Sequence, residues 1–269
     1  MVDDDSPIEQ IAFLARSAPR VHALEHLLSS GPTTRREFRN ELAASRSTVT
    51  RTLAQLEERG WLSESEGTYR LTLSGQLITE QFLSLTQAIQ TTEELSPFLN
   101  WFPYTEFDLD LDLLTDAEIT ASTPADPYAP GKCQTEFIET HSQFRGLLPS
   151  IEIDSVRAVH ERIMTGEFES ELVVSDVVGE RITTGEFARL FQEQLETGQV
   201  AIHVVDGGLP FFLGRCEDSS VQLGVEDDEG FPRALLETEN DALAAWADSV
   251  YETYLSRADR MPVGAFENG

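Results

Sequence analysis

The residues of this chain that could do chemistry are arginines concentrated in its first 75 positions. Residues 1–75 carry nine arginines and eleven acidic residues, a net charge of −2, whereas residues 76–269 have a net charge of −27. Without the acidic first 15 positions, residues 16–75 have a net charge of +2. Because the rest of the chain is so acidic, the small positive charge of this segment favours its binding to a polyanion such as nucleic acid.

Spacing around Ser45 predicts a helix that presents polar groups at its N-terminus. Ser45 has the residue type of an N-cap, and Val49, Leu53 and Leu56 follow at the spacing of one buried helical face. The N-terminus of such a helix offers free N–H groups and a partial positive charge. The residues expected to contact base edges or nearby phosphates are Ser45, Arg46, Ser47, Thr48, Thr50 and Arg51.

Further arginines precede and follow this helix. Arg35, Arg36 and Arg39 lie on the preceding short helix and suit phosphate contacts, and Arg70 lies on a strand after it. An alternative for each arginine is a solvated side chain or an ion pair with a nearby glutamate. The expected hairpin tip carries Glu64 and Glu66 and no basic residue, which argues against insertion of a basic side chain into a minor groove.

The elements that position these arginines are expected to be helices and a hairpin. Helices are predicted over residues 7–16, 19–30, 33–44 and 45–59, followed by two short strands within 61–73 around a turn at Glu66-Gly67. Ile8, Ile11 and Leu14 are expected to form the packing face of the first helix. This order predicts a winged helix-turn-helix over residues 1–74, whose recognition helix enters the major groove of DNA.

The run from Glu41 to Gly75 resembles the recognition helix and wing of archaeal MarR/ArsR-like winged-helix regulators. The resemblance covers residues 20–75 and rests on STVTRTLAQLEERGWL, which combines a cap, a helix face and the first strand of the wing. It implies a DNA-binding domain of a transcription regulator.

Residues 75–104 are expected to form a linker or dimerisation helix. Ile78, Phe82, Leu85 and Ile89 are spaced as in a coiled-coil seam. They would pack against the same residues of a second copy, or, in the alternative, against their own domain. A two-fold homodimer would match a pseudo-palindromic operator.

Residues 105–260 alternate between helical and strand patterns, and residues 261–269 are read as a tail. Strands are predicted at 117–123, 169–175, 199–206, 210–216, 219–225 and 232–238, with helices over 135–143, 155–166, 185–198 and 241–257 and a short apolar segment at 144–150. The order predicts a mixed-sheet α/β domain, so the fold class of the whole chain is α+β or mixed.

This second half resembles the effector-type domain of archaeal regulators related to the methanogenesis regulatory proteins. The resemblance rests on TPADPYAP, FRGLLPS, LVVSDVV, DGGLPFFL and WADSVYETYL and covers most of 105–258. It implies transcriptional control and names no ligand.

Catalysis is not expected from the second half. It lacks GxSxG, P-loop and GxGxxG motifs, and Lys132 lacks the histidine that an HxK pattern of phospholipase-like domains requires. The five histidines and two cysteines have no metal-ligand spacing, so neither a metal nor a cofactor is expected. Cys133 as a redox switch is a further alternative.

An effector site is expected instead, for an anionic metabolite. Its candidate residues are Tyr128, Lys132, His141 and Arg145 in a turn-rich segment, with Ser175 and Asp206 at strand ends. The alternative for the charged groups among them is ordinary ion pairing in a strongly acidic domain.

The composition favours a cytoplasmic protein of a high-salt cell. The chain has a net charge of −29 and a single lysine among 19 basic residues, and molar salt shortens the Debye length to about 3 Å. No apolar run is long enough to cross a membrane, and the acidic N-terminus is unlike a signal peptide.

Together these patterns predict a homodimeric, DNA-binding transcription regulator whose second half senses a small molecule. The alternative is a ligand-free promoter-binding repressor whose second half serves dimerisation or protein contact. The sequence leaves open the operator, the effector and the choice between activation and repression.

Overall fold

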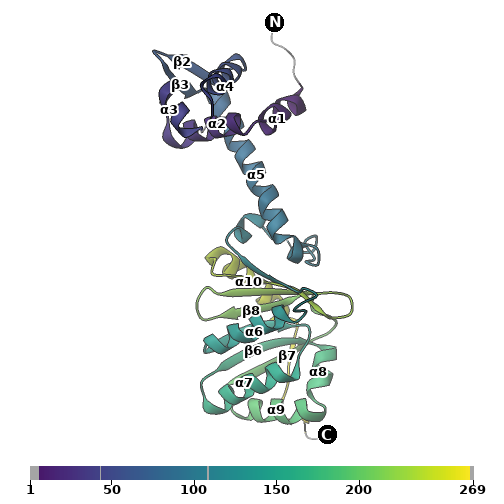
Figure 1. Cartoon of the computed structure of the whole chain (residues 1–269). Helices are drawn as coiled ribbons and strands as arrows, with labels where there is room; N and C mark the ends of the chain where they lie inside the picture. Colours follow the sequence, from purple (N-terminus) through teal and green to yellow (C-terminus); the bar gives the residue numbers. More distant parts are fainter. Residues whose placement is uncertain (1–5, 43, 108, 267–269) are drawn as a thin grey trace. The chain divides into compact units, whose positions relative to one another are not determined.

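The computed structural model describes residues 6–42, 44–107 and 109–266, and the chain divides into an N-terminal unit, residues 1–90, and a C-terminal unit, residues 91–269 (Figure 1). The elements of the N-terminal unit are α1 (Pro7–Ala15), α2 (Ala18–Ser30), β1 (Thr33–Thr34), α3 (Arg35–Glu41), α4 (Arg46–Glu58), β2 (Leu62–Ser65), β3 (Thr68–Leu71) and the first part of α5 (Leu73–Leu99). The order of three helices and a hairpin after α1 confirms the predicted winged helix-turn-helix.

Side-chain caps fix where the helices of this unit begin. Thr34 caps α3 in a reciprocal pair with Glu37, and the Ser45 hydroxyl accepts a hydrogen bond from the Thr48 N–H at 3.2 Å. Thr33, the residue before this cap, pairs with Tyr69 in the small sheet β1-β3-β2.

The core of the N-terminal unit is built from the faces that the spacing predicts, with one correction. Val49, Leu53 and Leu56 are fully buried, and they pack with residues of α2, α3 and the wing. On α1 only Leu14 is buried, whereas Ile8 and Ile11 are 73% and 45% exposed. The prediction that all three pack inward was therefore wrong, because only the last turn of α1 reaches the core.

The wing is the hairpin β2–β3, and its turn is at Glu66 and Gly67 as predicted. Both residues have positive φ angles, 53° and 78°, as a two-residue turn that follows the twist of the strands requires. The Glu64 carboxylate accepts the Gly67 N–H at 2.6 Å, so this acidic residue stabilises the turn.

Helix α5 begins directly after the wing and contributes to both units. Ile78 and Phe82 are partly buried against the core of the N-terminal unit, while Leu85 and Ile89 are exposed. After the division at residue 90, Leu95 and Phe98 are buried in the core of the C-terminal unit.

The C-terminal unit is a mixed α/β domain, which confirms the predicted fold class. Its further elements are η1 (Leu111–Leu114), β4 (Glu118–Ala121), α6 (Ala129–Thr140), β5 (Gln143–Leu148), α7 (Ile153–Thr165), β6 (Glu169–Ser175), α8 (Asp176–Ile182), α9 (Gly185–Glu196), β7 (Val200–Val205), β8 (Phe212–Cys216), β9 (Val221–Glu226), β10 (Pro232–Thr238), α10 (Asp241–Leu255), β11 (Asp259–Arg260) and η2 (Val263–Phe266).

One eight-stranded sheet organises this unit, in the order β11-β7-β6-β5-β8-β9-β10-β4. The central strands β5, β6 and β7 are parallel, and every other pairing is antiparallel. The parallel strands are connected through α7 and through α8 with α9, as crossover connections require.

Each face of the sheet buries its own core. Leu147 and Val173 face the side covered by α10, η1 and the end of α5, whereas Leu148, Leu172 and Val174 face α6, α7 and α9. This alternation explains why the second halves of β5 and β6 are apolar runs, as strand segments covered on both faces are.

Candidate nucleic-acid interface

The beginning of α4 presents polar and basic side chains that are mostly exposed. Because Val49, Leu53 and Leu56 face the core, Arg46, Ser47, Thr50 and Arg51 are exposed and Thr48 is half-buried. Within residues 6–42, 44–107 and 109–266, neither Arg46 nor Arg51 forms an ion pair. The Ser45 hydroxyl lies 2.9 Å from those of Ser47 and Thr48, so the cap orders the first turn of the helix.

Helix α3 packs against α4 and adds three arginines. Arg36 and Arg39 are exposed, and neither forms an ion pair in the part of the chain that the structure describes. Arg35 donates a hydrogen bond to the Tyr69 hydroxyl, and its guanidinium lies 5.6 Å from the centre of the Tyr69 ring. The hydrogen bond raises the pKa of Arg35. Tyr69 therefore holds Arg35 in place, a role that the sequence did not indicate.

Two arginines of the N-terminal unit have structural roles. Arg20 and Arg59 stack on the ring of Phe13, at 3.8 Å and 3.6 Å from its centre. Arg20 also donates to the Phe13 carbonyl at 2.5 Å and to Gln55 at 3.0 Å, and burial lowers its pKa. Part of the arginine surplus therefore stabilises the fold.

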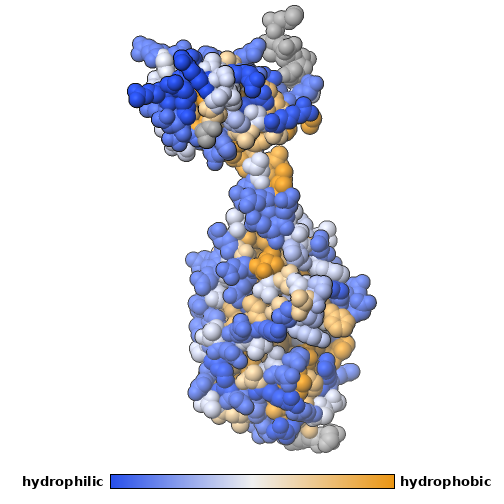
Figure 2. Space-filling model, in the orientation of Figure 1, coloured by the Kyte–Doolittle hydropathy of each residue, from blue (hydrophilic) through white to orange (hydrophobic). Residues whose placement is uncertain are grey.

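The remaining predicted contact, Arg70, is exposed on β3 opposite Ser63. Hydrophilic side chains gather at the surface over α3 and the wing (Figure 2). The wing tip itself carries Glu64 and Glu66, as the sequence indicated, so the positive groups lie on α3, α4 and the base of the wing.

The predicted dimerisation residues are divided between a groove and an exposed helix face. A groove of about 470 Å³ between α1 and α5 is lined by Ile11, Trp61, Ile78 and Phe82 among others. Leu85 also reaches this groove, and Ile89 is 52% exposed further along α5. Hydrophobic side chains are visible at the surface along this part of α5 (Figure 2).

The six predicted effector residues do not converge on one site. Lys132 pairs with Asp126 at 2.8 Å, and Arg145 lies 3.4 Å from Asp248 and 3.8 Å from Glu252. His141 follows the last turn of α6, roughly 13 Å along the helix from Lys132. Tyr128 is exposed beside the start of α6.

The two polar residues expected at strand ends also have other surroundings. Ser175 is buried and its hydroxyl caps α8 by accepting the Val178 N–H at 3.2 Å. Asp206 is exposed after β7. The ion pairs and the cap match the alternative of ordinary structural contacts.

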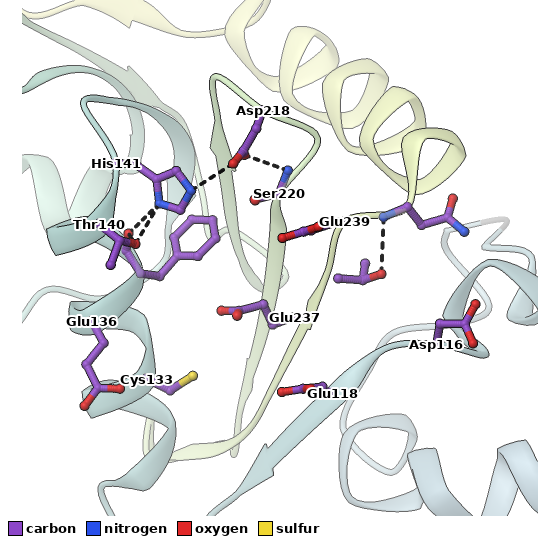
Figure 3. A pocket seen from close by; sticks show the side chains of 13 residues that line it. Asp116, Glu118, Cys133, Glu136, Thr140, His141, Asp218, Ser220, Glu237 and Glu239 are labelled. Carbon is purple, nitrogen blue, oxygen red and sulfur yellow. Dashed lines mark hydrogen bonds and ion pairs between the residues drawn. The ribbon is translucent and has the colours of Figure 1, made fainter.

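A large hollow near these residues is acidic. A pocket of about 700 Å³ is lined by His141 and by six carboxylates, and the close-up shows several of these around the opening (Figure 3). The carboxylates belong to Asp116, Glu118, Glu136, Asp218, Glu237 and Glu239. His141 Nε2 lies 3.3 Å from Asp218, whose pKa is lowered chiefly by its hydrogen bond with Ser220. This lining repels an anionic ligand.

The cysteines are poorly suited to thiolate chemistry. Burial raises the pKa of Cys133, and it raises the pKa of Cys216 to about 12, so both thiols are protonated at neutral pH. Among the described residues there is no group of three or more histidine, cysteine or acidic side chains arranged to hold a metal ion.

Family models match both units of the chain. Residues 8–94 match the HVO_A0261 N-terminal domain, and residues 127–257 match the middle domain of the methanogenesis regulatory protein FilR1. Together the two matches support an archaeal-type transcription regulator. The resemblance of its second half to methanogenesis regulatory proteins is thereby confirmed.

Solved structures resemble this regulator only distantly. TrmBL2, an archaeal chromatin protein, is 12% identical, with 95% of this chain and 100% of the other covered and a TM-score of 0.43. NucT from Helicobacter pylori is 13% identical, with 54% and 99% covered and a TM-score of 0.43. The phospholipase D family member Nuc from Salmonella typhimurium is 11% identical, with 54% and 99% covered and a TM-score of 0.42. Such low scores support no argument.

No curated protein matches the regulator. In the described part of the chain, no helix has both the length and the hydrophobicity that crossing a bilayer requires.

Proposed function

We propose that this regulator binds promoter DNA in a sequence-specific manner through α4. The observation that supports this proposal is made at the N-terminal end of α4. There Ser45 orders the first turn, and the exposed Arg46 and Arg51 form no ion pair with described residues. In the major groove, a bidentate arginine contact with a guanine edge contributes about 1–3 kcal/mol of discrimination. Ser47, Thr48 and Thr50 would contact bases, thymine methyl groups or phosphates.

The arginines of α3 would fix the regulator on the DNA backbone. Arg36 and Arg39 are exposed next to α4, and Tyr69 restrains Arg35, so less side-chain entropy would be lost when Arg35 binds a phosphate. Arg70 would add a contact from the base of the wing.

The DNA-bound form would be a homodimer. Helix α5 forms one wall of the groove between α1 and α5, and the exposed Leu85 and Ile89 lie on the same helix. One surface therefore offers both projecting apolar side chains and an apolar groove. A two-fold interface requires this kind of self-complementary surface. The exposed Ile8 and Ile11 of α1 would be covered by the same partner.

The C-terminal unit would make DNA binding respond to a small molecule. The predicted anionic ligand is not favoured by the geometry, because Lys132 and Arg145 are paired and the large pocket is acidic. The alternative in which this unit serves only dimerisation or protein contact predicts that no compound stabilises it.

Selection from a pool of random DNA duplexes tests the proposal. The full-length protein is expected to enrich one motif with two related half-sites, assayed at the salt concentration at which it is best folded. Arg46→Ala should relax the selection at one position in each half-site. Arg16→Ala is the control, because Arg16 is exposed at the end of α1 and its loss removes the same charge. Recovery of no motif by the wild-type protein would overturn the proposal.

A further inference from the structure

A separate cavity of about 120 Å³ lies on the face of the sheet that α6, α7 and α9 cover. It is between α6 and α7 and over β5 and β6. Its walls are largely apolar, from Ile138, Phe144, Val159, Leu172 and Phe191. Ser150 and Glu152 also line it and are exposed, so the cavity opens to the surface at the beginning of α7. It shares no lining residue with the acidic pocket.

One polar side chain of the cavity has no hydrogen-bond partner. Gln194 of α9 is 2% exposed, and within the described residues its side-chain nitrogen has no acceptor. An unsatisfied buried donor is costly, because it gave up its hydrogen bonds to water on folding. A leucine would have filled the same space among these apolar neighbours without that cost. An acceptor supplied by a bound molecule would satisfy the amide.

Size and charge restrict what that molecule is. A cavity of about 150 Å³ lined by apolar side chains accommodates benzene, so this one, which is smaller but open to the surface, suits a single ring with at most a small substituent. No lysine or arginine lines it, which disfavours an anion. Its one lining carboxylate, Glu152, already accepts hydrogen bonds from the Ser155 N–H and hydroxyl at the beginning of α7.

We propose that this cavity is a binding site for an uncharged, mainly apolar small molecule, of single-ring size, that presents one hydrogen-bond acceptor to Gln194. Its role as the effector site rests on the proposed function of the chain as a DNA-binding regulator. The site itself does not depend on DNA binding.

Two probes of the same shape separate the hydrogen bond from simple filling of the cavity. Benzonitrile and phenylacetylene have the same number of heavy atoms, and only the nitrile offers a strong acceptor. Calorimetric titration of the full-length protein is expected to show that benzonitrile binds about tenfold more tightly than phenylacetylene. In Gln194→Leu the ratio of the two affinities should fall about tenfold, to parity or below.

Two further variants distinguish the site from general effects. Gln192→Leu removes an amide of the same helix that bonds Glu196 outside the cavity, and it should keep the wild-type ratio. Ser170→Leu adds carbon atoms inside the cavity and should abolish binding of both probes. Without ligand, Gln194→Leu should raise the Tm by about 2–4 °C, because the unsatisfied donor is removed, and this shows that the variant folds.

The outcomes decide between the site and its alternatives. Binding of neither probe, or equal binding of both to the wild-type protein, would overturn the proposed site. An unchanged ratio in Gln194→Leu would overturn the role of the amide. Binding of benzonitrile that leaves the DNA affinity unchanged would overturn the effector role, whereas loss of DNA recognition by the wild-type protein would overturn the proposed function and leave the site intact.

Discussion

The arginines of the two units differ in what they contact. In the C-terminal unit five of the nine arginines pair with carboxylates, namely Arg145, Arg157, Arg189, Arg215 and Arg233. In the N-terminal unit Arg36, Arg39, Arg46 and Arg51 pair with none of the described residues. Arginines that stabilise the fold pair with a carboxylate, as Arg215 does, or contact an aromatic ring and a backbone carbonyl, as Arg20 does. Of the arginines on the adjacent helices α3 and α4, the four other than Arg35 are exposed and have none of these contacts among the described residues, so they are the candidates for binding an external anion.

The largest expected effect tests the structural role of the paired arginines. Arg215 is mostly buried, bonds Asp248 at 3.2 Å and donates to the carbonyls of Cys216 and Ser220 at 2.7 and 3.3 Å. Arg215→Ala should lower the free energy of unfolding of the C-terminal unit by about 3 kcal/mol, since it leaves acceptors unsatisfied. Scanning calorimetry measures the loss. A change below about 0.5 kcal/mol would contradict the assignment of Arg215 to stability.

A second prediction concerns the exposed apolar side chains of α5 in the N-terminal unit, for which the contacts of the arginines give no explanation. Leu85→Glu with Ile89→Glu should convert a dimer into a monomer, because two charges would be buried against a partner. Sedimentation velocity measures the mass. The control is Gln87→Glu, which adds one charge to the same exposed stretch of α5 outside the predicted seam. A dimer that survives the double substitution would place the interface elsewhere.

A third prediction sharpens the distinction among the unpaired arginines. Arg36→Ala and Arg39→Ala should each weaken binding to all DNA sequences about equally, by roughly threefold, and lower the slope of log K against log salt by about 1. The melting temperature should not change, because neither side chain contacts a carboxylate among the described residues. Fluorescence anisotropy at several salt concentrations measures the slope. A loss confined to one sequence would mean that the residue reads bases instead.

The smallest expected effect concerns the acidic wing. Glu66 has a φ of 53°, a conformation that asparagine adopts more easily than glutamate. Glu66→Asn should therefore raise the stability of the N-terminal unit by about 0.5 kcal/mol. Ser65→Asn on the adjacent strand position is the control. A lower melting temperature for Glu66→Asn would contradict this description of the turn.

Local patterns predicted much of the fold. β6 and β10 have the predicted bounds, because each has an apolar centre flanked by polar residues. Ser45 and Thr34 act as caps because capping depends on a few adjacent residues. Helix α8 was missed since it follows β6 without a break and spans only seven residues. β11 has two residues and no pattern of its own.

The sequence predicted only those features of the site that depend on residues close together along the chain. The buried face of α4 determines which of its residues are exposed, so Arg46 and Arg51 could be selected from spacing. The contact of Arg35 with Tyr69, and the stacking of Arg20 and Arg59 on Phe13, join distant positions and depend on packing. The predicted effector residues do not converge, because closeness in sequence is not closeness in space. Lys132 and His141 are near in sequence but lie at opposite ends of α6. The amide of Gln194 gave no sequence signal, since the pattern of α9 predicts only a helix.

The affinity of the full-length protein for its selected DNA duplex tests the central claim most directly. The double substitution Arg46→Ala with Arg51→Ala removes two arginines that form no ion pair with described residues. It is compared with the double substitution Arg145→Ala with Arg189→Ala, which removes two arginines that pair with carboxylates. Both proteins thus lose the same charge. The first double substitution is expected to weaken specific binding on the order of 100-fold, and the second is expected to change it less than about twofold. Equal losses in the two proteins would show that only net charge matters and would contradict the account.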